Sequence, residues 1–242
     1  MIIKKIKNKI RQFDEFRDHT KRAQELSRVM NADTLAMIQL NGLLNGEFIP
    51  ITEFSLRPYT LVHILNDMLI NNRRTIVEFG SGISTIAISY LIKQKGLNVR
   101  LISFDHDDQW QEVIVKEYLK ENSGEIQMVH APLSITANGI NEGQRWYDEG
   151  VIDQILKNTK ADMIIIDGPL GATNEFARYP AIGTVKKYLH DDGMVVVDDI
   201  HRPDERRLVK DLILEGFLPN WSFRHCMLSK QTGFNSNPLG RV

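Results

Sequence analysis

Five apolar, strand-like runs separated by helical stretches constrain most strongly how this chain of 242 residues folds. The runs are Thr75–Phe79, Val99–Phe104, Ile126–Val129, Met163–Ile166 and Met194–Val197. The helical patterns between and after them lie near 84–95, 109–120, 149–158, 179–190 and 204–215. Strands that alternate with helices predict βαβ crossovers and a mostly parallel sheet. Because the runs are apolar throughout, we expect helices on both faces, which makes this an α/β, doubly wound fold.

The first 50 residues are predicted to form a helical extension of a domain that spans 51–242. Ile3, Ile6, Ile10 and Phe13 recur at helical spacing between basic residues, which predicts a helix from residue 2 to about 30. Residues 1–30 carry a net charge of +5 and the remainder of the chain −6. We favour a helix that packs on its own domain or on a twin subunit in a homo-oligomer. Weak contact with a membrane surface or another partner is the alternative.

The other end of the chain is predicted to complete the sheet with an antiparallel edge hairpin. Its strands are expected at Trp221–Met227 and, more weakly, at Thr232–Phe234. A further helix is expected from Arg57 to about Leu69, ahead of the first strand.

Composition limits the partners and the compartment. The net charge of −1 gives no general attraction to nucleic acid. The single cysteine, Cys226, excludes an internal disulfide and favours a reducing, cytoplasmic location. No apolar stretch reaches the length of a transmembrane span, and the N-terminal residues lack the apolar core of a secretory signal.

The most informative motif is the turn that follows the first strand. Glu78 precedes Gly80, Ser81 and Gly82, and a helix opens at about Ser84. Glycines let the backbone turn sharply and approach a ligand closely, and the helix N-terminus attracts a carboxylate. Glu78 would repel a pyrophosphate but attract an ammonium group. The turn therefore suits a zwitterionic amino acid.

A second acid follows the next strand. Asp105, with His106 beside it, is placed to accept hydrogen bonds from ribose hydroxyls. An amino acid joined to a nucleoside satisfies both positions, and S-adenosylmethionine is such a ligand. This predicts cofactor contacts from Glu78, the Gly80–Gly82 turn, Ser84, Asp105 and His106, and also from Asp167 after the fourth strand.

Two other functions remain open at this point. A nicotinamide-dependent oxidoreductase would use a similar sheet, but position 85 holds threonine instead of the third glycine of a dinucleotide fingerprint. The other alternative is a non-catalytic binding module that keeps the fold without the activity.

These residues resemble the class I S-adenosylmethionine-dependent methyltransferases, and over about 50–225 the chain is similar to the TylF-like and methyltransferase 24 groups of bacterial small-molecule methyltransferases. The stretches that carry the narrower likeness are Ile166–Pro169, Ala177–Pro180, Gly193–Asp199 and Arg202–Glu205. The resemblance implies a seven-stranded Rossmann-like sheet of order 3-2-1-4-5-7-6. It also implies methyl transfer to a small-molecule acceptor, for example a sugar or another polyhydroxylated metabolite.

The resemblance further implies a Mg²⁺ site, because some relatives hold the ion with three aspartates at positions that match Asp167, Asp198 and Asp199. Mg²⁺ accepts such oxygen ligands and could bind an acceptor diol. Pro169 and Leu170, and the residues after Asp199, depart from the pattern of the metal-using relatives. Without a metal, Asp167 would bind substrate directly, and the aspartate pair would support a loop or a helix start.

Further site residues are expected around these aspartates. His201 is a candidate general base, with Asp167 as the other catalytic candidate. Arg178 could pair with an acidic substrate, and Trp146 and Tyr147 could stack on a ring. The polar segment from Ser134 to Gly150 is predicted to be a loop that covers the site.

Overall fold

The structure is a computed structural model that describes residues 2–119 and 126–238, and side chains from residue 16 onward except those of residues 19 and 22. The helices are α1 Ile2–Leu43, α2 Pro58–Ile70, α3 Ile83–Lys95, α4 Asp108–Tyr118, α5 Glu149–Leu156, α6 Ala181–Tyr188 and α7 Pro203–Leu214. The strands are β1 Thr75–Phe79, β2 Arg100–Asp105, β3 Ile126–His130, β4 Leu133–Ile135, β5 Arg145–Tyr147, β6 Ala161–Ile166, β7 Leu189–Val197, β8 Leu218–Trp221 and β9 Cys226–Ser229.

Seven strands form one twisted sheet in the order β3-β2-β1-β6-β7-β9-β8. The first five strands run parallel to one another, and β9 runs antiparallel to both β7 and β8. The labels differ from the predicted order only because β4 and β5 form a separate hairpin. Numbered within the sheet alone, the strands follow 3-2-1-4-5-7-6, so the predicted α/β fold is confirmed.

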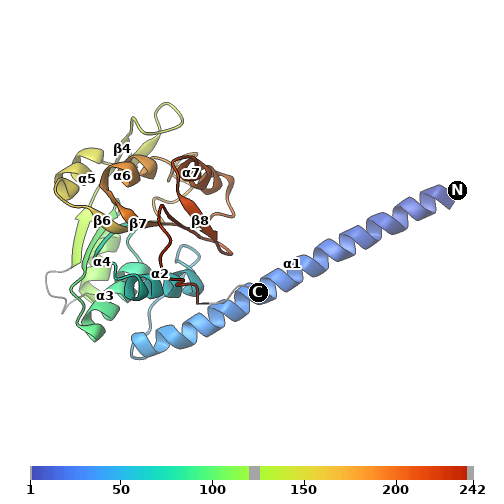
Figure 1. Cartoon of the computed structure of the whole chain (residues 1–242), viewed down its shortest axis with the longest axis horizontal. Coiled ribbons are helices and arrows are strands. Elements are labelled where there is room, and N and C mark those ends of the chain that lie inside the picture. Colours follow the sequence, from blue (N-terminus) through green and yellow to red (C-terminus); the bar gives the residue numbers. More distant parts are fainter. Residues whose placement is uncertain (1, 120–125, 239–242) are drawn as a thin grey trace.

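Helices cover both faces of the sheet, with α2, α3 and α4 on one side and α5, α6 and α7 on the other (Figure 1). Alternate residues of each central strand point to opposite faces. In β1, for example, Ile76 packs in the core on the α2–α3 side, whereas Val77 and Phe79 pack in the other core. The continuous apolar runs in the sequence therefore reflect burial on both faces.

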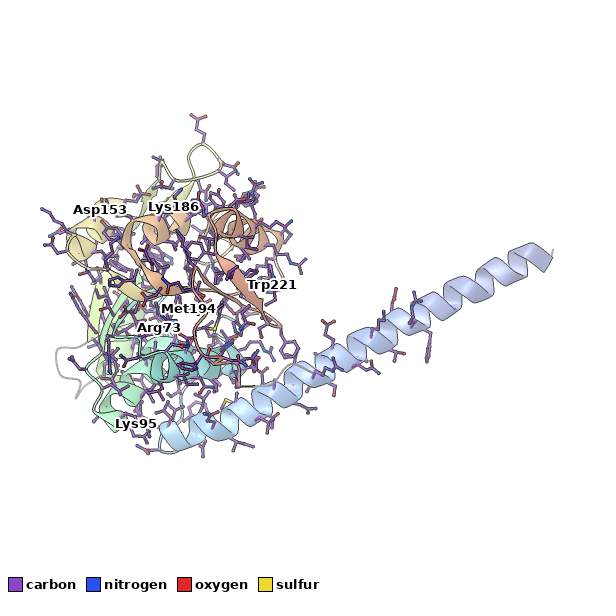
Figure 2. All side chains as sticks on the ribbon, viewed as in Figure 1. Arg73, Lys95, Asp153, Lys186, Met194 and Trp221 are labelled. Atoms are coloured by element: carbon purple, nitrogen blue, oxygen red, sulfur yellow. The ribbon has the colours of Figure 1, made fainter. Side chains whose placement is uncertain are left out.

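Helix α1 is longer than predicted and extends well away from the body (Figure 1). Its 42 residues span ~63 Å at the usual helical rise. Small and apolar side chains near its C-terminal end, including Ala32, Ala36 and Leu40, are buried against the body. The stripe predicted at Ile3, Ile6, Ile10 and Phe13 lies outside the described side chains. Figure 2 shows most side chains gathered around the body, while the N-terminal half of the α1 ribbon extends away from it.

Two segments differ from the prediction. The segment expected to be a loop at 134–150 includes most of the antiparallel pair β4 and β5. Each of these strands has three residues, which is too short to show the alternation of apolar and polar residues that marks a strand in a sequence. The C-terminal hairpin exists, but its turn lies at 222–225, inside the strand predicted from Trp221 to Met227, and Thr232–Phe234 is not a strand. The prediction placed the apolar Phe223 in a strand, whereas in the structure it packs on the core from within the turn.

Within the described residues, no helix combines the length and apolar character needed to cross a membrane.

An ion pair joins the end of α1 to the start of α2. Arg57, the residue before α2, donates to Asp33 Oδ2, and the Tyr59 N–H donates to Asp33 Oδ1 at 3.2 Å. The N-cap residue of α2 supplies no capping bond of its own. Asp33 therefore caps α2 from another helix and fixes the segment between the two helices.

Replacing Asp33 with alanine should lower the free energy of unfolding by about 1–3 kcal/mol, because α2 loses its cap and Arg57 its partner. Glu25→Ala, an exposed change on the same helix, should stay within about 0.5 kcal/mol of the wild type. Urea-induced unfolding measures both variants. Equal effects at the two positions would contradict the role given to Asp33.

Candidate active site at the carboxyl edge of the sheet

A cavity of about 340 Å³ lies at the carboxyl ends of β1, β2 and β6, where ligands bind in open α/β sheets. Gly80, Ser81, Gly82, Asp105, His106 and Asp167 line it, as expected from the sequence. A larger hollow of about 680 Å³ lies near Asp153, at the edge of the molecule (Figure 2) and at the amino end of β6. Its lining consists mostly of exposed polar side chains. The first cavity is therefore the candidate site.

The floor of the cavity is a close contact between two backbone turns. The Gly168 N–H donates a hydrogen bond of 2.6 Å to the carbonyl oxygen of Phe79, the residue that precedes Gly80. A Cβ on Gly80 would lie 2.7 Å from the Gly168 nitrogen, and one on Gly168 would lie 2.8 Å from the Gly80 Cα. Gly80 also has φ 101°, a conformation that strongly favours glycine. Both glycines are thus required by the contact that joins the turns after β1 and β6.

Glu78 lies beneath this floor and does not line the cavity. Its side chain is fully buried, and its Oε2 accepts hydrogen bonds from Thr85 at 2.5 Å and Ser103 at 2.6 Å. Its Oε1 has no hydrogen-bond partner among the described residues. Burial raises the pKa of Glu78 to about 7, although hydrogen bonds from neighbouring hydroxyls oppose the shift. Ser84 also faces Glu78 and not the cavity.

The backbone N–H groups of the turn are already hydrogen-bonded. Gly80 donates to the Phe104 carbonyl at 2.9 Å, Ser81 to Asp105 Oδ2 at 2.7 Å, and Gly82 to Thr85 Oγ1 at 2.9 Å. These three N–H groups are therefore not available to a ligand carboxylate. The remaining polar groups of the turn are carbonyl oxygens and nearby acids, which favour a cation.

Asp105 occupies the tip of β2, as predicted, and faces the cavity while only 6% exposed. His106 Nδ1 lies 3.2 Å from its Oδ1, and the neighbouring Asp105 carboxylate raises the pKa of His106.

Sequence analysis missed two parts of the cavity wall. Trp110 lines it and donates from its indole nitrogen to the Ser81 carbonyl at 2.8 Å. The α1–α2 connection contributes Ile49, Phe54 and Leu56 from the opposite side. Trp110 is three residues after Asp107, which caps α4, so helical spacing could have indicated it. No local pattern pointed to the α1–α2 connection.

Asp167, Asp198 and Asp199 lie together at the ends of β6 and β7, as the resemblance implied. One ligand oxygen from each lies within 4.8 Å of the others. The buried Arg178 already bridges two of them, with its Nη2 3.4 Å from both Asp167 Oδ1 and Asp199 Oδ2. A guanidinium nitrogen thus stands where a cation shared by these carboxylates would lie.

Two more arginines converge on Asp199. Arg202 Nη1 lies 3.1 Å from Asp199 Oδ2, and Arg224 Nη2 donates to Asp199 Oδ1. Burial would raise the pKa of Asp199, but Arg178 and Arg224 outweigh it and hold this pKa below its usual value. A divalent cation would add two positive charges beside three guanidinium groups. The residues present therefore do not fit Mg²⁺.

The other titratable groups near this cluster respond to burial and to neighbouring charges. Burial raises the pKa of Asp167 to about 6, with Arg178 opposing the shift, and raises the pKa of Asp198 well above its usual value. His201 lies outside the cavity lining, with its Nδ1 3.8 Å from Asp199 Oδ1. Burial and then Arg224 lower the pKa of His201.

Gly80→Ala should destabilise the protein by roughly 1–3 kcal/mol or more, because the new Cβ meets the Gly168 backbone at an unfavourable φ. Gly82→Ala is the matched control, since its Cβ would have open space in an extended backbone. Thermal unfolding should show a large loss only for Gly80→Ala. Similar melting temperatures for the two variants would contradict this geometry.

The raised pKa of Glu78 should appear as a pH-dependent cost to stability. The unfolded carboxyl ionises near pH 4.5 and the folded one near pH 7, so folding binds a proton between these values. As pH rises across this range, the wild type should lose on the order of 3 kcal/mol relative to Glu78→Gln. Denaturant unfolding between pH 4.5 and 8 measures this difference. Parallel pH profiles for the two proteins would contradict it.

A family model identifies the family of this chain, and solved structures agree on its fold. A family model described as "Methyltransferase domain" matches residues 77–200, just over half of the chain. The structure of a putative caffeoyl-CoA O-methyltransferase from Staphylococcus aureus is similar, with a TM-score of 0.52, 13% identity, and coverage of 82% of this chain and 98% of that one.

The methyltransferase PaMTH1 of Podospora anserina, solved with SAH bound, has a TM-score of 0.52 and 11% identity, and covers 81% of this chain and 88% of its own. At these identities the two structures establish the fold alone. No match to the sequence is found among curated proteins. Because the family model covers just over half of the chain, from Val77 in β1 to Ile200 after β7, and includes the turns after β1, β2 and β6 that line the cavity, the chain belongs to the methyltransferase-domain family.

Proposed function

We propose that this methyltransferase binds S-adenosylmethionine over the Gly80–Gly82 turn and methylates an oxygen atom of a small-molecule acceptor. S-adenosylmethionine supplies a methyl group made electrophilic by a sulfonium. The acceptor, a cytoplasmic location and the absence of a nucleic-acid partner are parts of this proposal that rest on the sequence.

The observation that carries the proposal is the polarity of the turn. The N–H groups of Ser81 and Gly82 donate hydrogen bonds to side chains of the protein. Asp105 and Asp167 line the same cavity. Glu78 adds a fully buried carboxyl group below the turn. Such a site attracts a ligand with an ammonium and a sulfonium group. Because Glu78 does not line the cavity, we expect it to act through the field it creates and by holding Thr85.

The same polarity disfavours the nicotinamide-dependent alternative. A dinucleotide pyrophosphate needs free backbone N–H groups at the turn and the helix start. Here two of those groups are already hydrogen-bonded, and the buried Glu78 lies directly below.

Asp105 and Asp167 take different roles in this proposal. Asp105, at the tip of β2, accepts hydrogen bonds from the ribose hydroxyls. Asp167 lines the cavity on the side of β6 and, with a pKa of about 6, is ionised at neutral pH. It can therefore accept a proton from an acceptor hydroxyl. His201, farther from the cavity, remains a prediction from the sequence.

Calorimetry with S-adenosylmethionine and S-adenosylhomocysteine tests the proposal. Asp105→Asn should weaken binding of both by about tenfold or more, because a charge-assisted hydrogen bond is lost. Asp108→Asn, an exposed change in the first turn of α4, should bind like the wild type. Failure of the wild type to bind either ligand, or equal affinities for the two variants, would overturn the proposed site.

A further inference from the structure

Three arginines from separate segments gather around one carboxylate beside the cavity. Arg178 precedes α6, Arg202 precedes α7, and Arg224 lies in the turn between β8 and β9. Each has a guanidinium nitrogen within 4.0 Å of an oxygen of Asp199. Asp167 and Glu205 also contact Arg178, and Asp198 lies beside Asp167 and Asp199, so the three guanidinium groups face four carboxyl groups. Burial raises the pKa of Asp198 well above its usual value and also raises that of Glu205, which favours the uncharged forms of these two acids.

Two of these guanidinium groups have hydrogen-bond donors that the protein does not use. Arg178 Nη1 and Arg224 Nε are buried and have no partner among the described residues. The whole Arg178 residue is only 4% exposed. Leaving a buried donor unpaired costs about 1–3 kcal/mol, and more for a charged group. An acceptor oxygen from a ligand would relieve this cost.

The arginines are also placed at the edge of the cavity. Arg178 Nε donates to the Pro169 carbonyl at 3.2 Å, and Pro169 lines the cavity. Arg202 Nη1 lies 2.9 Å from where a Cβ on Gly171 would be, next to Leu170 of the lining. This is the Asp167 side of the cavity, whereas Asp105 and the proposed ribose position lie on the side of β2.

Solvent access favours the positive groups over the acids. The side chains of Arg202 and Arg224 are 41% and 32% exposed, whereas that of Asp199 is 8% exposed. A solute that approaches the cluster therefore meets guanidinium groups first. Arginine forks match the oxygen pairs of carboxylates and phosphates.

We propose that Arg178, Arg202 and Arg224 form an oxyanion subsite, so that the methyl acceptor carries a carboxylate or a phosphate group. This inference rests on the proposed function, because it assigns the acceptor to the side of the cavity opposite the cofactor. The anionic group binds the exposed arginines and directs a hydroxyl of the same molecule toward Asp167. The guanidinium groups thereby take the position that Mg²⁺ would have if the chain used a metal, as some of the methyltransferases that it resembles do.

Inorganic phosphate and acetate, titrated separately into the full-length protein saturated with S-adenosylhomocysteine, test the subsite by calorimetry. At least one should bind, with a Kd on the order of millimolar. Arg202→Ala and Arg224→Ala should each weaken that binding by about tenfold or more. Arg100→Ala, an exposed change at the start of β2, should leave it unchanged. Binding of one probe alone identifies the acceptor group as phosphate or carboxylate.

Mn²⁺ serves as the opposing probe, followed by electron paramagnetic resonance in the same samples. The wild type should leave the ion free, and thermal unfolding should confirm that both arginine variants fold. Binding of neither anion, anion binding unaffected by the arginine changes, or a Mn²⁺ site lost in Asp199→Asn would each overturn the subsite. Saturation with S-adenosylhomocysteine is measured first, so failure there counts against the proposed function and not against the subsite alone.

Discussion

The contact between the backbones of Gly80 and Gly168 is the constraint on which the site depends. β1 lies between β2 and β6 in the sheet. The strand order therefore reverses beside β1, with β2 and β3 on one side of it and β6 and β7 on the other. The hydrogen bond from Gly168 to Phe79 brings the turn after β1 against the turn after β6. Asp105 and Asp167 therefore face one cavity, although 61 residues separate them. A side chain at either glycine would push the two turns apart.

This arrangement separates charge across a short distance. On the β1–β2 side, Glu78 and Asp105 lie beside a turn whose N–H groups are already hydrogen-bonded. On the β6–β7 side, three arginines surround Asp199 beside Asp167, Asp198 and Glu205, and two of these arginines have a buried donor without a partner among the described residues. A cationic methyl donor and an anionic acceptor would thus each meet the opposite charge. Their mutual attraction would further bring the reacting atoms together, which is the main contribution that positioning makes to such a reaction.

The sequence predicted local structure and local motifs better than contacts between distant segments. β1 was predicted at its observed bounds because its apolar run ends at a glycine that must turn. The aspartates were placed correctly because carboxyl ends of neighbouring parallel strands share one edge. Sequence spacing could not show that Arg178, Arg202 and Arg224 would meet, since three separate loops bring them together. The Mg²⁺ interpretation considered the three aspartates alone and did not include these arginines.

The α1–α2 connection links the outer helix to the site in a way that the predicted division at residue 50 does not capture. Ile49 and Pro50 lie on one side of that division and Phe54 and Leu56 on the other, yet all four line one cavity. Asp33 of α1 holds Arg57 and the start of α2, so it ties the α2 end of this wall to α1. Movement of α1 would therefore change the wall as well as the surface of the protein. We infer that the C-terminal part of α1 belongs with the catalytic unit, and that only its outer part is an extension.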